Sequence, residues 1–402
     1  MVRIAIEVSI IIPSHNRYPL NLLTLYSLDA QGYDMSQVEV ILIDDASSDA
    51  TPSIAANQCF SFQFRYVRLA KNLGRPRARN FGISNSRGTH LIFLDAEVIV
   101  PPDFIDSHMR IHRQQSRIIA GGLYAMKKTY TRMDPLFSHE QRLEAEALLR
   151  RQPALYEKWL ETRHLKDPPC LIGRDEIKLG LYRDLSLENP HSTQFANQVL
   201  RLYGDWFSGF NLPWITAGTG NLSVERRAFE VHGMFEEYEG WGADDIEMGF
   251  RLYTNGYRFV HLSSMPTYHQ EHPIQTSISE EGKHNFYLFQ QKYRTINLLA
   301  ILLVFRCGMS YSEASRVLDD VHAISLHEYP HRFMHLINTF RAMLESVGRL
   351  SRYGLPIHNL DKQCGYLISS PYERLFHAEK NALEQSGKYL HLNQALDLLL
   401  SY

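Results

Sequence analysis

The first 125 residues alternate short apolar runs, rich in β-branched residues, with segments of helical spacing. Strands separated by helices in this way are typical of a parallel sheet with crossover helices. We expect strands over 8–12 (ended by Pro13), 38–43, 64–69 and 91–94, and helices over 20–30 and 75–86. The chain is therefore predicted to be an α/β protein.

The pattern changes after this part of the chain. Residues 135–206 are charged and favour helices, which suggests an insertion, and residues 257–269 again read as strands. After about residue 272 the sequence is helical to its end. We expect a helical insertion and a helical C-terminal region, through which the chain could form oligomers.

Composition excludes several classes of protein. With 402 residues and 44% hydrophobic content, the chain can bury a large core. With a net charge of −2, the chain has no overall excess of basic residues of the kind that nucleic-acid-binding proteins usually carry. The four scattered cysteines favour neither structural zinc nor a disulfide framework, which fits a reducing, cytoplasmic setting.

No segment reads as a membrane span or a signal peptide. The longest apolar run, residues 296–305, is much shorter than the roughly 20 residues that a bilayer requires. We expect it to form a buried helix. Peripheral contact with a membrane through the C-terminal region is compatible with this sequence.

The apolar strand over 91–94 ends in Asp95-Ala96-Glu97. Two carboxylates at a strand end can share a hard cation, and Mg²⁺ or Mn²⁺ held in this way usually completes its shell with phosphate oxygens and water. The motif therefore predicts a site for a metal-bound nucleotide diphosphate. The alternative is an acidic turn without a ligand.

Other polar clusters also follow predicted strands, where ligands bind in such sheets. Ser14-His15-Asn16 follows the first strand and Asp44-Asp45 the second. Asp45 could accept hydrogen bonds from a base or a ribose, or it could cap a helix. The arginines after Gly74 could approach an anion, or they could form an exposed basic helix start.

Two later segments carry candidate catalytic groups. Asp244 and Asp245 follow Gly240-Trp241-Gly242 at the expected start of a helix, where the simple interpretation is capping. The helix dipole lowers a carboxylate pKa, whereas the adjacent like charge raises it toward the range that suits a general base. The histidines of Tyr268-His269-Gln270-Glu271-His272 could be metal ligands, although a lone histidine is more often structural.

Together these segments resemble a family 2 glycosyltransferase with the GT-A fold, a nucleotide-binding mixed sheet flanked by helices. The resemblance covers roughly 8–125 and 210–272. The matching motifs are P-x-Y-N (13–16), D-D-x-S-x-D-x-T (44–51), N-x-G-x-x-x-A-R-N-x-G (72–82), D-x-D (95–97), G-N-x-S-x-x-R (220–226) and G-W-G-x-E-D-x-E-x-x-x-R-L (240–252).

The resemblance implies roles for individual residues. It implies a single inverting displacement in which Asp245, beside Asp244, deprotonates the acceptor. Mn²⁺ or Mg²⁺ would be bound by Asp95, Glu97 and His269, as in chondroitin-polymerase-like members with a similar Tyr-His-Gln segment, and His272 is the nearest alternative to His269. The nucleotide of a UDP-sugar would be held by Pro13, Ser14, His15, Asn16, Asp45, Gly74, Arg79, Asp95 and Ala96, and the sugar or acceptor would contact Gly220, Asn221 and Trp241.

The sequence departs from the family pattern at three positions. His15 replaces Tyr or Phe, which alters stacking on the uracil. Glu97 replaces the second Asp of D-x-D and is a longer ligand, and Asp244 replaces Glu beside Asp245. None of these changes removes a required charge, so we expect an active enzyme.

The resemblance also predicts the organisation of the chain. Residues 1–125 would bind the nucleotide-sugar, 126–209 would form the insertion, 210–275 the acceptor and catalytic half, and 276–402 the helical C-terminal region. A glycan, a lipid-linked glycan or a peptide side chain could be the acceptor. The alternatives are a non-catalytic GT-A-like module and a Rossmann oxidoreductase, and the latter lacks its G-x-G-x-x-G after the first strand.

Overall fold

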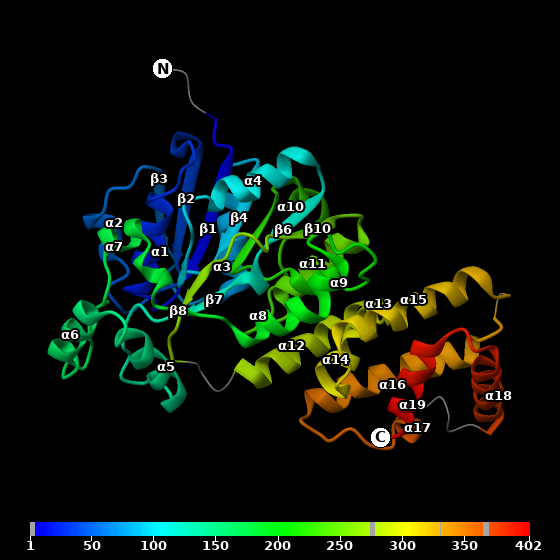
Figure 1. The fold of residues 1–402 in the computed structure, drawn as a ribbon. Coiled ribbons are helices and arrows are strands. Elements are labelled where there is room, and N and C mark those ends of the chain that lie inside the picture. The colour runs from blue at the N-terminus through cyan, green and yellow to red at the C-terminus, as the bar shows by residue number, and fades with distance from the viewer. Residues whose placement is uncertain (1–4, 274–277, 330, 365–369) are drawn as a thin grey trace. The chain divides into compact units, whose positions relative to one another are not determined.

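The computed structural model describes residues 5–273, 278–329, 331–364 and 370–402. The chain divides into two compact units (Figure 1). Unit 1 comprises Met1–Ala196, Trp214–Glu239 and Asp244–Thr276, and unit 2 comprises Asn197–Pro213, Gly240–Ala243 and Ser277–Tyr402.

Unit 1 is built on a seven-stranded sheet with the order β10-β6-β9-β4-β1-β2-β3. β1 pairs in parallel with β2 and β4, whereas β9 runs antiparallel to β4 and β6, so the sheet is mixed. The bounds are β1 (Val8–Ser14), β2 (Val38–Asp44), β3 (Gln63–Arg68), β4 (His90–Leu94), β6 (Ile118–Gly121), β9 (Asn221–Glu225) and β10 (Arg258–His261).

The predicted α/β class and its first four strands are confirmed, with boundaries shifted by one or two residues. The prediction that the first strand ends at Pro13 is wrong. The parallel ladder continues through Pro13 to Ser14, opposite Asp44, and the Ser14 carbonyl accepts a hydrogen bond from the Asp45 N–H at 2.8 Å. A proline lacks only the N–H donor, so the ladder persists through its carbonyl side.

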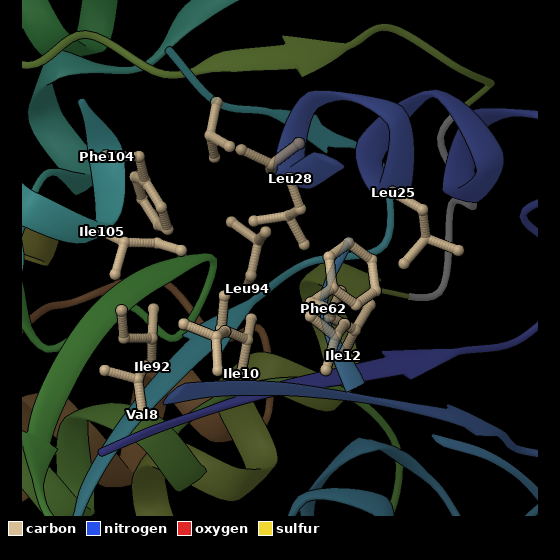
Figure 2. Packing of buried hydrophobic residues seen from close by; sticks show 14 of the residues in the cluster. Val8, Ile10, Ile12, Leu25, Leu28, Phe62, Ile92, Leu94, Phe104 and Ile105 are labelled. Atoms are coloured by element: carbon tan, nitrogen blue, oxygen red, sulfur yellow. The ribbon is translucent and has the colours of Figure 1, made fainter. Parts of the chain in front are cut away.

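Helices cover both faces of this sheet. Figure 2 shows the packing of one face, where side chains from β1 and β4 meet α1 and α4: Val8, Ile10, Ile12, Ile92, Leu94, Leu25, Leu28, Phe104 and Ile105. α3 packs on the other face against β1, where a β-carbon on Gly82 would lie 2.5 Å from Ile11 Cγ2. The helices of this core are α1 (Leu20–Asp29), α2 (Ser53–Asn57), α3 (Arg75–Asn85), α4 (Phe104–Gln114), α10 (Arg227–His232) and α11 (Asp244–Thr254).

A second, four-stranded sheet in unit 1 has the order β5-β11-β7-β8. Its strands are β5 (Val98–Ile99), β7 (Lys127–Thr129), β8 (Ser186–Leu187) and β11 (Tyr268–Gln270). β11 pairs antiparallel with β5, so that His269 lies opposite Val98, one residue after Glu97. This small sheet brings two distant motifs together.

The expected insertion is mainly helical. It contains α5 (His139–Leu149), α6 (Pro153–Thr162), α7 (Arg174–Leu179) and α8 (Pro190–Phe195). Its buried side chains form a cluster with Tyr268 of β11 that includes Tyr130, Leu148, Leu149 and Tyr182. The insertion therefore packs on the small sheet.

Unit 2 confirms the predicted helical C-terminal region. Its helices are α9 (Arg201–Tyr203), α12 (Ile278–Tyr293), α13 (Ile296–Leu299), α14 (Ile301–Cys307), α15 (Tyr311–His327), α16 (Met334–Arg352), α17 (Leu360–Gln363), α18 (Ser370–Ser386) and α19 (Leu390–Leu400). The apolar run over 296–305 is largely buried as expected, but it is divided between α13 and α14, and Phe305 is 48% exposed. Within the described residues, no helix has the length and apolar character needed to cross a bilayer.

Candidate active site

The loops after β1 and β2 are tied to each other at the carboxyl edge of the large sheet. His15 Nδ1 donates to the Asp45 carbonyl at 2.7 Å, and the Asn16 N–H donates to Ser47 Oγ at 3.0 Å. Asn16 Oδ1 accepts from the Ser48 N–H at 2.7 Å. These bonds bring the P-S-H-N and D-D-A-S segments together, as the predicted nucleotide site requires.

Asp45 is buried and its carboxylate holds the loop that leads into α3. One oxygen accepts from the Leu73 N–H at 2.7 Å and the other from the Gly74 N–H at 2.8 Å. Asp45 therefore does not cap α2, whose N-cap is Pro52. Each carboxylate oxygen keeps a further lone pair for a base or ribose donor.

Ser14 is almost fully buried, and its hydroxyl accepts from Asn21 Nδ2 at 3.1 Å. Ala96 is also buried, and its carbonyl accepts from Thr24 Oγ1 at 2.8 Å. Both residues therefore fix the backbone of the strand ends. Their predicted contacts with a nucleotide stay predictions.

Asp95 begins a tight turn in which its carbonyl accepts from the Val98 N–H at 3.1 Å. Its side chain is one-third exposed, and one oxygen lies 3.7 Å from Arg79 Nη2. Gly220 approaches this carboxylate so closely that a β-carbon there would lie 2.8 Å from Asp95 Oδ2. Any larger residue at position 220 would therefore have to displace the Asp95 carboxylate.

Three side chains of the same edge converge as a potential metal site. Glu97, His269 and His272 each offer a ligand atom, and these atoms all lie within 4.8 Å of one another. His272 Nε2 is 3.3 Å from Glu97 Oε1. The structure thus places His272 beside the predicted ligands Glu97 and His269, and Asp95 is not part of this group of three.

The donor set fits Mn²⁺ or a similar ion, which accepts imidazole and carboxylate ligands. His269 Nδ1 lies 3.2 Å from Glu271 Oε1, an outer carboxylate of the kind that orients metal-bound histidines. His272 Nδ1 is buried and has no hydrogen-bond partner among the described residues. This unpaired nitrogen could therefore bind a metal ion together with Glu97 and His269.

The charges at this group favour an anionic glutamate. Burial acts to raise the pKa of Glu97, but the positive charge of Arg17, together with the neighbouring histidines when they are protonated, lowers it to about 2. Burial lowers the pKa of His272 to about 4, so its imidazole is neutral at pH 7. The pKa of His269 is raised: burial opposes the proton, but the bond to Glu271 and the charge of Glu97 stabilise it. A metal at His269 would therefore compete with a proton.

The predicted catalytic pair lies at the start of α11. Asp244 is buried and accepts from Arg79 Nη1 at 2.6 Å. Asp245 Oδ1 accepts from the Ile246 N–H at 2.8 Å. Burial, together with the neighbouring Asp244 charge, raises the pKa of Asp245 to about 6, although Arg79 opposes this shift.

Arg79 links the two acidic sites rather than extending from an exposed helix start. Its guanidinium contacts Asp244 and approaches Asp95, and its side chain is only 5% exposed. Its Nε has no hydrogen-bond partner within the described part of the chain. The predicted contact of Arg79 with uridine stays a prediction.

Two of the predicted sugar or acceptor residues have other partners. Asn221 is fully buried, and its Oδ1 pairs with His108 Nε2 at 2.9 Å. Trp241 belongs to unit 2, where its backbone N–H donates to Glu281 Oε2 at 2.8 Å. Their roles toward a sugar stay predictions.

Sequence reasoning missed two groups near these motifs. His108 carries no motif of its own, yet it holds Asn221 and Ser223 of the G-N-x-S segment from α4. Arg17 follows P-S-H-N directly, and its Nε lies 3.2 Å from Glu97 Oε1. Its position beside a motif was the one signal that could have identified it.

Comparison with known proteins identifies two matching family models. The model described as glycosyl transferase family 2 matches residues 9–177, and the one described as the N-terminal domain of galactosyltransferase matches residues 207–273. Both matches fall on segments of the large sheet and the candidate site.

Curated relatives point to the same class of enzyme. The uncharacterized glycosyltransferase YfnE of Bacillus subtilis is 26% identical over 343 residues, covering 85% of this chain and 83% of YfnE. Validoxylamine A glucosyltransferase of Streptomyces hygroscopicus subsp. jinggangensis is 27% identical over 62% of this chain and 51% of that protein. Chondroitin synthase of Pasteurella multocida is 27% identical over 67% of this chain and 25% of its own length. The chain thus spans about half the length of the glucosyltransferase and a quarter of the length of the chondroitin synthase.

Proposed function

We propose a donor, a metal and a stereochemical course for this chain, which is a glycosyltransferase with a family 2 domain of the GT-A type. The donor is a UDP-sugar, the cation is Mn²⁺ or Mg²⁺, and the sugar is transferred with inversion. The acceptor is a glycan, a lipid-linked glycan or a peptide side chain. The observation that carries this proposal is the convergence of Glu97, His269 and His272 in the same unit as an Asp245 carboxylate of raised pKa.

Asp245 acts as the general base in this reaction. The nucleophilic oxygen of the acceptor attacks the anomeric carbon of the donor and its proton moves to the Asp245 carboxylate. At the same time the bond between the anomeric carbon and the phosphate oxygen breaks, and UDP leaves with the bonding electrons. A pKa of about 6 keeps this carboxylate ionised at pH 7 while making it a stronger base than an ordinary aspartate.

Glu97, His269 and His272 would hold the cation, with Asp95 approaching it or the ribose. When bound, the cation supplies positive charge that stabilises the leaving diphosphate. Arg79 partly neutralises the negative charges of Asp244 and Asp95, because it pairs with Asp244 and faces Asp95. The loops that hold Asp45 and Asn16 would receive the uridine.

The base assignment is tested with Asp245→Asn, which keeps the shape of the side chain. Purified wild-type protein is first screened against UDP-sugars for Mn²⁺-dependent hydrolysis by mass spectrometry, which identifies the donor without an acceptor. We expect Asp245→Asn to lower the rate of transfer to an identified acceptor about 100-fold or more. The control Glu230→Gln changes an exposed carboxylate of α10 and should leave the rate unchanged. An Asp245→Asn enzyme with the wild-type rate would refute the role.

The metal assignment is tested separately by calorimetry. Replacing Glu97 and His269 together by alanine should abolish the stimulation of UDP binding by Mn²⁺, and His272→Ala should weaken it. Unchanged affinity in the double variant would exclude this metal site. If no donor is hydrolysed or transferred although UDP binds, the chain is instead a sugar-nucleotide-binding module.

A further inference from the structure

Arg17 contacts the same oxygen of Glu97 as the candidate metal ligand His272. Its Nε lies 3.2 Å from Glu97 Oε1, and the imidazole of His272 lies 3.3 Å from the same atom. The Glu97 side chain is 7% exposed, whereas the Arg17 side chain is 27% exposed. One buried carboxylate oxygen is thus shared by a guanidinium and a candidate metal ligand.

The backbone of Arg17 is fixed although its side chain reaches solvent. Its carbonyl accepts from the Asn21 N–H at 3.0 Å. The residues on either side are held by the loop after β2: the Asn16 N–H donates to Ser47 Oγ at 3.0 Å and the Tyr18 N–H donates to Asp49 Oδ2 at 2.7 Å. A motion of the guanidinium would therefore need only side-chain rotation.

A divalent cation and the Arg17 guanidinium repel each other when both contact one carboxylate. A cation bound by Glu97 and the histidines would therefore weaken the ion pair with Arg17. That cation would also bring phosphate oxygens to the same place, because such ions complete their shells with phosphate. A guanidinium forms paired, charge-assisted hydrogen bonds with phosphate.

We propose that Arg17 is the counter-cation of Glu97 in the metal-free enzyme, and that cation binding releases its guanidinium to bind the diphosphate of the donor. Arg17 is then a donor-binding residue that exchanges partners in each cycle. This inference rests on the proposed metal-dependent function. It assigns Arg17 opposite effects on the two ligands: it weakens binding of the cation alone and strengthens binding of the nucleotide.

The test is calorimetry with Arg17→Gln, without any measurement of turnover. Titrated with Mn²⁺ alone, the variant should bind the ion about threefold or more tightly than wild type, because the competing ion pair is gone. Titrated with UDP at saturating Mn²⁺, it should bind UDP about 10- to 100-fold more weakly, because charge-assisted bonds to phosphate are lost. This pair of opposite shifts is the signature of partner exchange.

Two matched variants sharpen the test. Arg17→Lys keeps the charge but loses the planar fork, so its Mn²⁺ affinity should stay near wild type and its UDP affinity should be intermediate. Arg110→Gln removes an exposed arginine that pairs with Asp106 on α4, and it should change neither affinity. Thermal unfolding verifies that each variant is folded. If Arg17→Gln does not fold, the affinity of Arg17→Lys for UDP is used to test the inference instead.

The outcomes separate this inference from the proposed function. If wild type binds Mn²⁺ but Arg17→Gln binds it no more tightly, or binds UDP as well as wild type does, Arg17 is only a structural partner of Glu97 and the inference is overturned. If wild type does not bind Mn²⁺, the metal-dependent function itself fails.

Discussion

The raised pKa of Asp245 predicts the pH dependence of turnover. The base must be ionised, and with a pKa of about 6 the ionised fraction is about nine-tenths at pH 7 and about one-tenth at pH 5. Turnover at saturating donor and cation should therefore fall about tenfold between these pH values. An aspartate with an ordinary pKa near 3.9 would lose almost no activity over this range.

Asp244→Asn tests whether the raised pKa of Asp245 causes this pH dependence. The variant removes the like charge that raises the pKa of Asp245, while the burial of Asp245 remains. The acid limb of turnover should therefore move to lower pH, and activity at pH 5 should become a larger fraction of the plateau. The assay is the initial rate of UDP release from the identified donor between pH 5 and pH 8.

His269 offers a competing explanation for an acid limb, because its raised pKa makes protonation compete with metal binding. These origins differ in their response to the cation. A limb caused by His269 shifts to lower pH when the Mn²⁺ concentration is raised tenfold, whereas a limb caused by Asp245 at saturating cation does not. A limb that follows Mn²⁺ and ignores Asp244→Asn would refute our reasoning about the base.

Two further predictions concern the stability of unit 1. Gly82→Val should lower the free energy of unfolding by about 2 kcal/mol or more in urea denaturation, because even a β-carbon there would lie 2.5 Å from Ile11 Cγ2 and 2.8 Å from Ile43 Cδ1; Ser84→Ala on the same helix should have little effect, and equal losses would contradict the packing argument. Burial lowers the pKa of His108 to about 4 and that of His112 to about 3. Below about pH 6.5 the unfolded chain therefore binds protons at these histidines that the folded chain does not bind. The free energy of unfolding should fall by about 2 kcal/mol for each histidine between pH 7 and pH 5. His112→Gln should make this fall shallower in urea titrations, and an unchanged pH slope would show that His112 is not the group being protonated.

The sequence predicted the parallel half of the large sheet because its strands are apolar and end at polar clusters. An apolar run followed by polar residues is a local pattern, so the bounds of β1, β2 and β4 could be predicted to within two residues. β9 was not predicted as a strand. It is five residues long and lies between parallel strands as an antiparallel member, a placement that no local pattern specifies.

The candidate site was predictable to the extent that each residue carries its own motif. Glu97 and His269 were identified in this way, and the structure brings them together. The contribution of His272 depends on the turn after β11, and that of Arg17 depends on how the loop after β1 faces Glu97. Both are tertiary contacts, for which the linear spacing of residues gives no measure.

The pairing of β11 with β5 would also couple binding of the proposed cation to folding. Glu97 and His269 are far apart in the sequence and become neighbours only when β11 pairs with β5. An unfolded or partly assembled chain therefore does not hold Glu97 and His269 together, so the binding energy of the proposed ion would be available only to the completed unit. A high Mn²⁺ concentration would then raise the midpoint of thermal unfolding. The ion would bind only those molecules in which β11 has paired with β5, so ion binding would distinguish completely folded molecules from partly folded ones.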